Sequence, residues 1–287
     1  MKALPGVLIA LVLAIALSDH RSAGGAQRAV PAFDHVFVVV LENKTQSQLL
    51  GNRRAPRFNA FARRYAVLSR YSGVTHPSLP NYLALVSGST HGIRSDCVSC
   101  VVSARNLADT LEEAGLRWKV YAEGLPRAGF TGAFAGLYAK KHVPFLYFRD
   151  VLASEARRRL VVPLGQLSRD LSSGTLPAFS LIVPNLCHDM HSCPVAVGDA
   201  WLGRFLPPLL RNSELAHGVV FVVTDESSSL RKNGPVPALA LGPMVVGGSR
   251  YSVRTSHYGL LRTIEAAFSL SRLGRSARAK PITGIWR

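Results

Sequence analysis

The sequence predicts an α/β fold with a mainly parallel sheet that is covered by helices on both faces. Three continuous apolar runs, at residues 36–41, 179–183 and 219–224, are typical of strands buried on both faces. Stretches with helical spacing separate them, which is the alternation that a parallel sheet requires. With 287 residues, of which 48% are hydrophobic, the chain is long enough for one large domain of this kind.

Residues 1–26 have the pattern of a secretory signal peptide. Lys2 precedes an apolar run at 7–17, and a polar stretch then ends in Ala-Gly-Gly-Ala. A membrane anchor is the alternative, but this run is short for a span and no later stretch reaches about 20 apolar residues. We therefore expect a secreted protein in which residues 27–287 form a single domain.

The predicted strand at 36–41 ends in Glu42 and Asn43. Ligands of open α/β sheets collect where strands end, so these two residues are candidates for chemistry as well as turn formers. Residues 58–65 then have the spacing of a short amphipathic helix, and residues 68–72 that of a strand.

The segment 74–93 contains the candidate nucleophile, Ser78. Pro80 suits the first turn of a helix because its ring fixes φ and it has no N–H to leave unpaired, and apolar residues follow at helical spacing. We expect Ser78 just outside the helix N-terminus, where unpaired N–H groups and the helix dipole favour an anion. Simple capping of the helix by Ser78 is the alternative.

In the middle of the chain, predicted helices and strands continue to alternate. Residues 106–114 have helical spacing that stops at Gly115, 118–123 alternate as a strand, and 124–136 form a glycine-rich loop. Residues 138–145 place a lysine pair, Lys140 and Lys141, and His142 before an apolar run. Helix-end cations are the alternative interpretation of these residues.

The strand at 179–183 leads into a loop, 184–193, that contains two histidines and an aspartate between two cysteines. The four cysteines form two close pairs, Cys97 with Cys100 and Cys187 with Cys193, and an even count in an exported chain favours two disulfides. A four-cysteine zinc site is the alternative. Spacing does not fix the pairing, but we expect Cys187 and Cys193 to close the loop.

After a helix at 199–211, interrupted at Pro207-Pro208, the strand at 219–224 runs into Asp225 and Glu226. Two similar strands, far apart in the chain, thus both end in acidic residues. Bringing these ends together yields Glu42, Asn43, Asp225 and Glu226 as hard oxygen ligands for one divalent cation. Helix capping by Asp225 is the alternative. Residues 237–241 are expected to form the last core strand.

The last predicted helix begins near Ser256-His257 and ends near Phe268, and we expect a basic, mobile tail from about residue 273. The formal charge is +17, or about +16 without the first 26 residues. Such a charge attracts phosphorylated substrates and anionic membranes, or it only keeps the protein soluble. The basic residues lack aromatic interleaving, so we expect no specific nucleic-acid partner. No glycine-rich nucleotide fingerprint or Walker loop is present.

The nucleophile segment carries a family resemblance. Ser-Leu-Pro-Asn-Tyr at 78–82, Ser-Gly at 87–88 and His-Gly-Ile at 91–93 resemble the corresponding segment of the alkaline phosphatase superfamily. Beyond about residue 32 the chain is more similar to the bacterial phosphoesterase family of secreted acid phosphatases and phospholipases C. The resemblance implies an alkaline-phosphatase-like three-layer sandwich, with Ser78 as the nucleophile and Asn81 as a phosphate ligand.

Two further segments support the resemblance. Residues 185–193 match the family pattern Asn-Leu-Cys-x-Asp-Met-His-x-Cys, which implies that Asp189 and His191 lie near the active centre, although His188 replaces an expected asparagine. Residues 138–145 resemble a segment that lines the phosphate pocket, and His257 resembles a histidine that faces the site. Capping of the last helix is the alternative for His257.

These observations predict a secreted, monomeric phosphomonoesterase that forms a phosphoseryl intermediate. Ser78 would lie beside one divalent metal ion held by Glu42, Asn43, Asp225 and Glu226. The predicted substrate-binding residues are Lys140, His142, His76 and Asp189. Asn81 and His191 would stabilise the phosphate oxygens, and His191 or His257 would protonate the leaving oxygen.

Candidate substrates are phosphorylated small molecules and lipids, among them phosphoinositides, with peripheral contact to an anionic membrane. We expect one metal ion because the ligands of a second site cannot all be placed. A phospholipase C or other phosphodiesterase of the same family is one alternative. A non-enzymatic exported protein that binds anionic lipid or nucleic acid is the other.

Overall fold

The core of the molecule is a mainly parallel sheet that links distant parts of the chain. The computed structural model describes Met1 and residues 29–228 and 234–287, so the predicted signal peptide lies almost entirely outside the described residues. Among these residues one eight-stranded sheet has the order β11-β2-β10-β9-β1-β8-β4-β7. In that order its strands are β11 (Arg250–Tyr251), β2 (Ala66–Leu68), β10 (Ala238–Leu241), β9 (Gly218–Thr224), β1 (His35–Leu41), β8 (Phe179–Val183), β4 (Trp118–Ala122) and β7 (Val161–Pro163).

The parallel pairings include β1 with β8 and β9, and β4 with β7 and β8. Strand β10 is antiparallel to β9 and β2. Two small sheets pair β12 (Thr255–Ser256) with β3 (Tyr71–Ser72), and β5 (Phe134–Ala135) with β6 (Tyr138–Ala139). The predicted α/β class with a mainly parallel sheet is confirmed.

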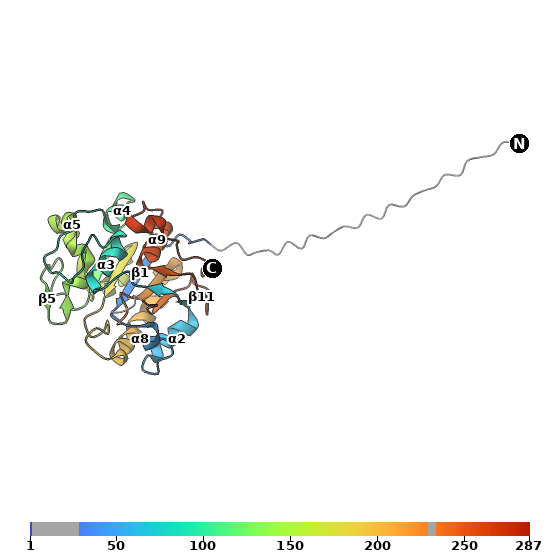
Figure 1. Ribbon diagram of the computed structural model, residues 1–287. Helices are drawn as coiled ribbons and strands as arrows, with labels where there is room; N and C mark the ends of the chain where they lie inside the picture. The colour runs from blue at the N-terminus through green and yellow to red at the C-terminus, as the bar shows by residue number, and fades with distance from the viewer. Residues whose placement is uncertain (2–28, 229–233) are drawn as a thin grey trace.

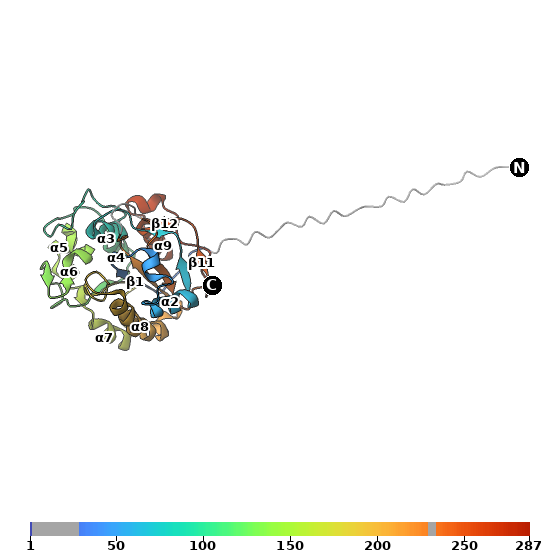
Figure 2. The same cartoon turned by 60° about the horizontal axis from the view of Figure 1, so that its bottom comes forward.

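Helices cover both faces of the sheet and make the molecule three layers thick (Figure 1). The α-helices are α1 (Gln46–Leu49), α2 (Pro56–Arg64), α3 (Ser78–Ser87), α4 (Leu107–Glu113), α5 (Arg149–Ala153), α6 (Glu155–Arg158), α7 (Gln166–Ser172), α8 (Val195–Arg211) and α9 (His257–Ala267). Short 3-10 helices are η1 (Lys140–His142), η2 (Pro144–Tyr147), η3 (Ser213–His217) and η4 (Gly274–Arg278). Helices α3, α4 and α9 lie on one face, and α2, α7 and α8 on the other (Figures 1 and 2).

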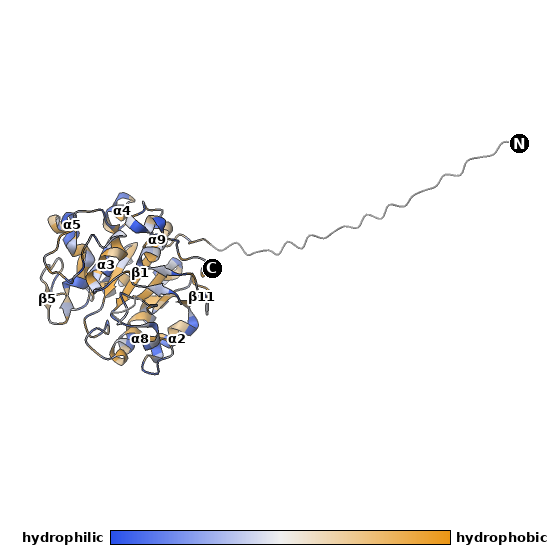
Figure 3. Ribbon diagram, viewed as in Figure 1, coloured by the Kyte–Doolittle hydropathy of each residue, from blue (hydrophilic) through white to orange (hydrophobic). Residues whose placement is uncertain are grey.

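Alternate residues of each central strand enter two separate hydrophobic cores. In β1, one core receives Val36, Val38 and Val40, and the other receives Phe37, Val39 and Leu41. Figure 3 shows the hydrophobic strands at the centre and hydrophilic residues on the outer helices. Burial of each such side chain is worth about 1.5–3 kcal/mol, which explains why residues 36–41 of this strand are all apolar.

Three predicted elements differ in detail from the structure. Helix α3 begins at Ser78 itself, after an extended Pro77, so Ser78 is the first helical residue and not the residue before the helix. The predicted strand at 68–72 is split into β2 and β3. Helix α8 continues through Pro207 and Pro208, because Leu206 and Leu209 on either side of them remain packed in the core.

The C-terminal segment, predicted as a mobile basic tail, is folded against the core. Ile282, Ile285 and Trp286 are buried, and the Trp286 ring packs edge-on against Phe33 at 5.2 Å. Apolar residues that follow the basic ones therefore anchor the segment, while Arg275, Arg278 and Lys280 remain exposed. Within the described residues, no helix combines the length and the apolar character needed to cross a bilayer.

Candidate active site

The carboxyl ends of β1 and β9 meet at the centre of the sheet and bring two predicted acids together. Leu41 is in register with Thr224, so Glu42 and Asp225 follow as neighbours. The backbone N–H of Asn43 donates to Asp225 Oδ1 at 3.0 Å, and the Asn43 side chain donates to Glu42 Oε2 at 3.0 Å. Asn43 adopts φ 53°, the left-handed conformation that asparagine tolerates better than most residues, which lets one residue bond both acids.

The hydroxyl of Ser78 points at this pair of acids. Its Oγ donates to Glu42 Oε2 at 2.9 Å, and the Tyr82 hydroxyl, one helical turn later, donates to Glu42 Oε1 at 2.6 Å. The N-cap residue of α3, Pro77, makes no side-chain cap hydrogen bond, and the first turn contains no acidic residue. Ser78 therefore lies at the positive end of a helix, with its proton held by a buried carboxylate.

Glu42, Asp189, Asp225 and Glu226 form what we name the acid cluster, and all four are buried. Burial, followed by the charges of Asp225 and Asp189, raises the pKa of Glu42 well above its usual range. Burial likewise raises the pKa of Asp189 to about 7, that of Asp225 to about 6 and that of Glu226 to about 8. Because buried like charges repel, these groups need protons or a cation to remain together.

The donor set of the acid cluster suits a hard cation. Asp225 Oδ2 is buried without a hydrogen-bond partner among the described residues. Glu226 Oε2 and Asp189 Oδ2 are buried beside ring nitrogens of His76 and His142. Carboxylate oxygens of this kind, with the amide of Asn43 and the hydroxyl of Ser78, are the ligands that Mg²⁺ or Ca²⁺ prefers. Over the same described residues, no three His, Cys, Asp or Glu side chains are already arranged as a metal site. The carboxylate oxygens are thus chemically suited to bind a cation. The side-chain oxygens of Asn43 and Ser78 would have to complete its ligand set.

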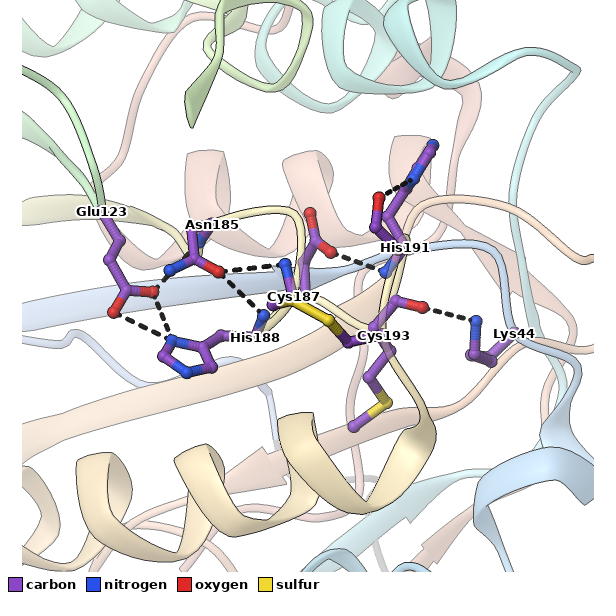
Figure 4. The surroundings of a disulfide bond; sticks show 10 residues. Lys44, Glu123, Asn185, Cys187, His188, His191 and Cys193 are labelled. Atoms are coloured by element: carbon purple, nitrogen blue, oxygen red, sulfur yellow. Dashed lines mark hydrogen bonds and ion pairs between the residues drawn. A yellow bond between two sulfur atoms is a disulfide. The ribbon is translucent and has the colours of Figure 1, made fainter. Parts of the chain in front are cut away.

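The loop after β8 supplies the fourth acid. A disulfide joins Cys187 to Cys193, as predicted (Figure 4). A second disulfide joins Cys97 to Cys100. The backbone N–H of His191 donates to Asp189 Oδ1 at 2.7 Å, and the backbone N–H of Glu42 donates to the Asp189 carbonyl at 2.8 Å. The cross-linked loop is thereby joined directly to the end of β1.

Lys44 strengthens the same junction. Its Nζ donates to the carbonyl of Met190 at 2.8 Å, a bond that Figure 4 also shows, and to the carbonyl of Asn43 at 3.2 Å. Met190 has φ 75°, an unusual conformation for its residue type, and its side chain is buried against Gly198. The loop is therefore held from both ends, which fixes Asp189 relative to Glu42.

His142 lies between two of the acids. Its Nε2 is 3.3 Å from Glu42 Oε1 and its Nδ1 is 3.3 Å from Asp189 Oδ2, while its ring stacks on Tyr82 with 5.1 Å between centroids. Burial lowers the pKa of His142 to about 3. Both nitrogens face carboxyl groups, so His142 connects Glu42 to Asp189 and leaves neither nitrogen free for a phosphate.

Comparison with known families accounts for this arrangement. Residues 52–271 match the model of the Phosphoesterase family. The chain belongs to this family. It is 36% identical over 284 residues to a phosphatidylinositol-3-phosphatase of Mycobacterium tuberculosis, which covers 98% of this chain and 92% of that protein.

More distant relatives of the family are fungal. The chain is 29% identical to a probable acid phosphatase of Kluyveromyces lactis and 28% identical to an acid phosphatase of Aspergillus fumigatus, each over 256 residues. These matches cover 85% of this chain but only 60% and 57% of the fungal proteins.

Solved structures show the same fold at low sequence identity. A protein of the alkaline phosphatase superfamily from Vibrio parahaemolyticus matches with a TM-score of 0.62 at 12% identity, over 88% of this chain and 72% of that one. A phosphonate monoester hydrolase of Agrobacterium radiobacter matches with a TM-score of 0.56 at 13% identity, over 83% and 74%. The three-layer fold predicted from the resemblance is therefore confirmed.

The structure gives Asn81, the predicted phosphate ligand, other partners. Its Oδ1 accepts from the backbone N–H groups of Val74 and Thr75, and its Nδ2 donates to the carbonyls of Thr75 and Pro77. These four bonds use the full hydrogen-bonding capacity of the amide. Asn81 thus folds the loop before Ser78 and has no group left for a phosphate in this arrangement.

His257, a predicted proton donor, is also fully occupied. Its Nε2 is 2.6 Å from the Asp225 carbonyl, which can only accept, so Nε2 carries the proton. Its Nδ1 then accepts from the Tyr71 hydroxyl at 2.8 Å. Burial lowers the pKa of His257 to about 4, which keeps this tautomer neutral. The chain Tyr71–His257–Asp225 holds the backbone of the acid cluster, which corrects the predicted role of a leaving-group acid.

The two lysines of η1 differ in where they point. Lys140 donates to the carbonyl of Val98 at 3.1 Å and lies over the Tyr147 ring, so it is not directed at Ser78. Lys141 pairs with Asp96 at 2.8 Å, and its charge lowers the pKa of Glu42. Lys141 is therefore the lysine whose field reaches the acid cluster, and the assignment of Lys140 to substrate binding needs correction.

The remaining predicted histidines lie around the cluster. His76 pairs through Nδ1 with Glu226 Oε2. His191 is exposed, with its ring 6.1 Å from that of His142, and only its Nδ1 is bonded, to Ser192. His188 instead turns away to Glu123, at 2.8 Å, as Figure 4 shows. Among these three, His191 has a ring nitrogen open to a bound substrate.

Three residues of the site were not predicted. Tyr82 could have been found, because it lies four residues after Ser78 on the same face of a helix. Lys44 and Asp96 carry no such signal in the sequence. Asp96 accepts the backbone N–H of Leu79 through Oδ1, at 2.9 Å, and bonds Lys141 through its other oxygen, so it joins the start of α3 to η1.

Proposed function

We propose that the protein is a metal-assisted phosphomonoesterase in which Ser78 is the nucleophile. The observation that supports this most is the Ser78 hydroxyl, bonded at 2.9 Å to the buried Glu42 at the N-terminus of α3. Membership of the Phosphoesterase family and the names of the phosphatase relatives agree with this reaction class. The acid cluster, which has no role in a simple binding protein, favours an enzyme over a non-enzymatic binder of anions.

In the proposed reaction, Ser78 Oγ attacks phosphorus and the bond from phosphorus to the leaving oxygen breaks. Glu42 orients the hydroxyl and, in its ionised form, provides an acceptor for its proton. The product of this step is a phosphoserine at position 78. Water then cleaves the phosphoserine and regenerates the hydroxyl, releasing inorganic phosphate.

The leaving oxygen needs a proton, and His191 is the residue we assign to this role. It is exposed, has a free Nε2 and belongs to the disulfide loop that also carries Asp189. Lys141 would stabilise the negative charge that develops on the phosphate oxygens. His76, paired with Glu226, lies in the loop that enters α3 and lines the same side of the nucleophile.

Glu42, Asn43, Ser78, Asp225 and Glu226 are the residues that would hold one divalent cation. Such an ion would lower the pKa of the Ser78 hydroxyl and offset phosphate charge. Asp225 Oδ2, which is buried without a hydrogen-bond partner among the described residues, supports this assignment. Without a cation, burial would disfavour the ionised form of Glu42, which is the form that accepts the proton of Ser78.

We further propose that the substrates are phosphate monoesters, including phosphorylated lipids, and that the protein acts outside the cytoplasm. The phosphatidylinositol-3-phosphatase relative spans nearly the full chain, which favours a phosphoinositide among the substrates. Two disulfides favour an oxidising compartment.

The test is a comparison of an aryl phosphate monoester with the matching diester. We expect faster monoester cleavage, loss of about 10⁴-fold or more in kcat for Ser78→Ala, and a phosphate on Ser78 in acid-quenched wild-type enzyme by mass spectrometry. Ser180→Ala, which removes another buried serine hydroxyl, is the control and should keep full activity. Faster diester cleavage would favour the phosphodiesterase, and no cleavage of either would favour a binding protein.

A further inference from the structure

A second concentration of charge lies at the N-terminus of α9 and has the opposite sign. A hollow of about 400 Å³ is lined there by Arg254, Arg275, Arg278 and Lys280, together with Ser72, Thr255, Ser256, Tyr258, Gly259 and Ala279. We name it the basic hollow. The first basic residue comes from the turn before β12, and the other three belong to the segment predicted as a mobile tail.

The four cations have no opposing charge. No acidic residue lines the hollow, and none of the four forms an ion pair within the part of the chain that the structure describes. Arg275 lies over the Tyr258 ring at 5.8 Å, which fixes its guanidinium at the wall. Four like charges on one concave surface repel one another, so the arrangement is favourable when an anion occupies it.

The floor of the hollow contributes unpaired hydrogen-bonding groups. Helix α9 has no side-chain cap at Ser256 and no acidic residue in its first turn, so its first N–H groups lack side-chain acceptors. Thr255 is buried, and its Oγ1 has no hydrogen-bond partner among the described residues. The helix dipole adds a positive potential at the same place.

Gly259 keeps the floor open. A Cβ at this position would come within 2.0 Å of Thr255 Oγ1, so no larger residue fits without displacing the threonine. The hollow is therefore shaped by Gly259 below and by arginines around its rim. Arginine forks bond two phosphate oxygens at once, and backbone N–H groups of a helix start bind phosphate as well.

From these observations we propose that the basic hollow is an anion site for a phosphate group, separate from the reaction at Ser78. The two sites share a helix turn, since His257, which holds the Asp225 carbonyl, lies between Ser256 and Tyr258 of the hollow. The phosphate could belong to a lipid headgroup or be free in solution, and the two arms of the experiment separate these sources.

The first arm measures vesicle binding in a Ser78→Ala background, which leaves the lipid intact. Phosphatidylcholine vesicles that contain a phosphatidylinositol monophosphate are sedimented with the protein. The hollow variant is Arg254→Gln/Arg275→Gln/Arg278→Gln. The control, Arg53→Gln/Arg54→Gln/Arg204→Gln, removes the same charge from a different hollow, which also contains Asp199. We expect the hollow variant to lose about tenfold more affinity than the control, since each basic residue at an anionic surface contributes measurably.

The second arm titrates inorganic phosphate into the same proteins by calorimetry. One phosphate fewer per chain in the hollow variant than in the control would show that the site takes free phosphate. A loss confined to vesicles would assign it to a lipid headgroup. Equal binding by the two variants in both arms would overturn the proposal and leave only a general effect of net charge.

Folding is checked by thermal unfolding of each variant, and the substituted side chains are exposed. If the triple variant unfolds early, Arg278→Glu replaces it, because this single exposed residue has no ion pair to lose among the described residues. Neither arm depends on catalysis, so the outcome stands apart from the test of the phosphomonoesterase.

Discussion

The acid cluster and the basic hollow both collect like charges, but they do so in opposite environments. The carboxyl groups of the cluster are buried, with Glu42 0% and Asp225 1% exposed, and burial raises their pKa values. The cations of the hollow are exposed. A buried cluster must bind a counter-ion or protons, whereas an exposed one only attracts its partner, in competition with salt.

This difference predicts that substitutions in the acid cluster change activity strongly and that substitutions in the basic hollow change it weakly. For Asp225→Asn, which keeps the size of the side chain but removes its charge, we expect kcat/KM to fall about 10³-fold because cation binding and charge stabilisation fail together. Elemental analysis of the purified variant should show less bound metal than in wild type. Glu113→Gln, at an exposed position, is the charge-matched control.

An unchanged rate after chelation, together with no metal in wild type, would contradict the cation assignment. Asp225 would then serve only to hold the Asn43 backbone.

The sequence allowed Glu42, Asp225 and Glu226 to be predicted because they follow apolar strands, whereas Asp189 was placed near the site only by the family resemblance. Glu42 and Asp225 stand at the ends of two such runs, and parallel strands place those ends side by side. The roles of Asn81, His257 and Lys140 could not be predicted in this way. The sequence placed these three residues near the site correctly. Whether each of their polar atoms is free or hydrogen-bonded depends on the conformation of the loop backbone, and residue types alone do not determine that conformation.

The C-terminal segment shows the same limit. Its basic residues were evident, but Ile282 and the pair Ile285-Trp286 are too short as apolar stretches to predict burial. Their burial depends on residues far away in the sequence, since the Ile282 N–H donates to Thr263 Oγ1 at 2.8 Å and the Trp286 ring packs against Phe33 and Phe221.

A pH experiment sharpens the contrast between the two regions. Without a cation, the native state keeps protons on Asp189 and Glu226, whose pKa values are raised to about 7 and about 8, while the unfolded chain has lost them. Since the native state binds more protons between about pH 4 and 8, this stabilising contribution is fully present at low pH and is lost as pH rises through that window.

We therefore expect the Tm of chelated protein to fall from pH 5 to pH 8, by about 2–4 °C for each kcal/mol lost. A divalent cation should restore the Tm more at pH 8 than at pH 5, because protons no longer compete for the oxygens. Measurement is by calorimetry with and without chelator. A cation effect that is equal at both pH values would show that the ion binds elsewhere.

The Tyr71–His257 pair provides a smaller effect that separates positioning from acid catalysis. Tyr71→Phe removes the hydroxyl that donates to His257, and His257→Gln keeps a donor to the Asp225 carbonyl. We expect each to reduce kcat about tenfold or less, with the shape of the pH–rate profile unchanged. Loss of the alkaline limb in His257→Gln would instead make His257 the leaving-group acid and remove that role from His191.

The smallest expected effect concerns salt, and it tests whether exposed cations act at a distance. A phosphoinositide in vesicles should be cleaved with a kcat/KM that falls about tenfold from low to high salt, because screening weakens the attraction of exposed charges to the membrane. A soluble aryl monoester needs no attraction to a membrane, so its kcat/KM should change by about twofold or less. In the Arg254→Gln/Arg275→Gln/Arg278→Gln variant, the salt dependence of kcat/KM for the vesicle substrate should approach that for the soluble substrate. The Arg53→Gln/Arg54→Gln/Arg204→Gln control should keep most of the wild-type salt dependence. Equal slopes for both substrates in wild type would mean that the basic surface does not guide lipid to Ser78, and the two regions would then act independently.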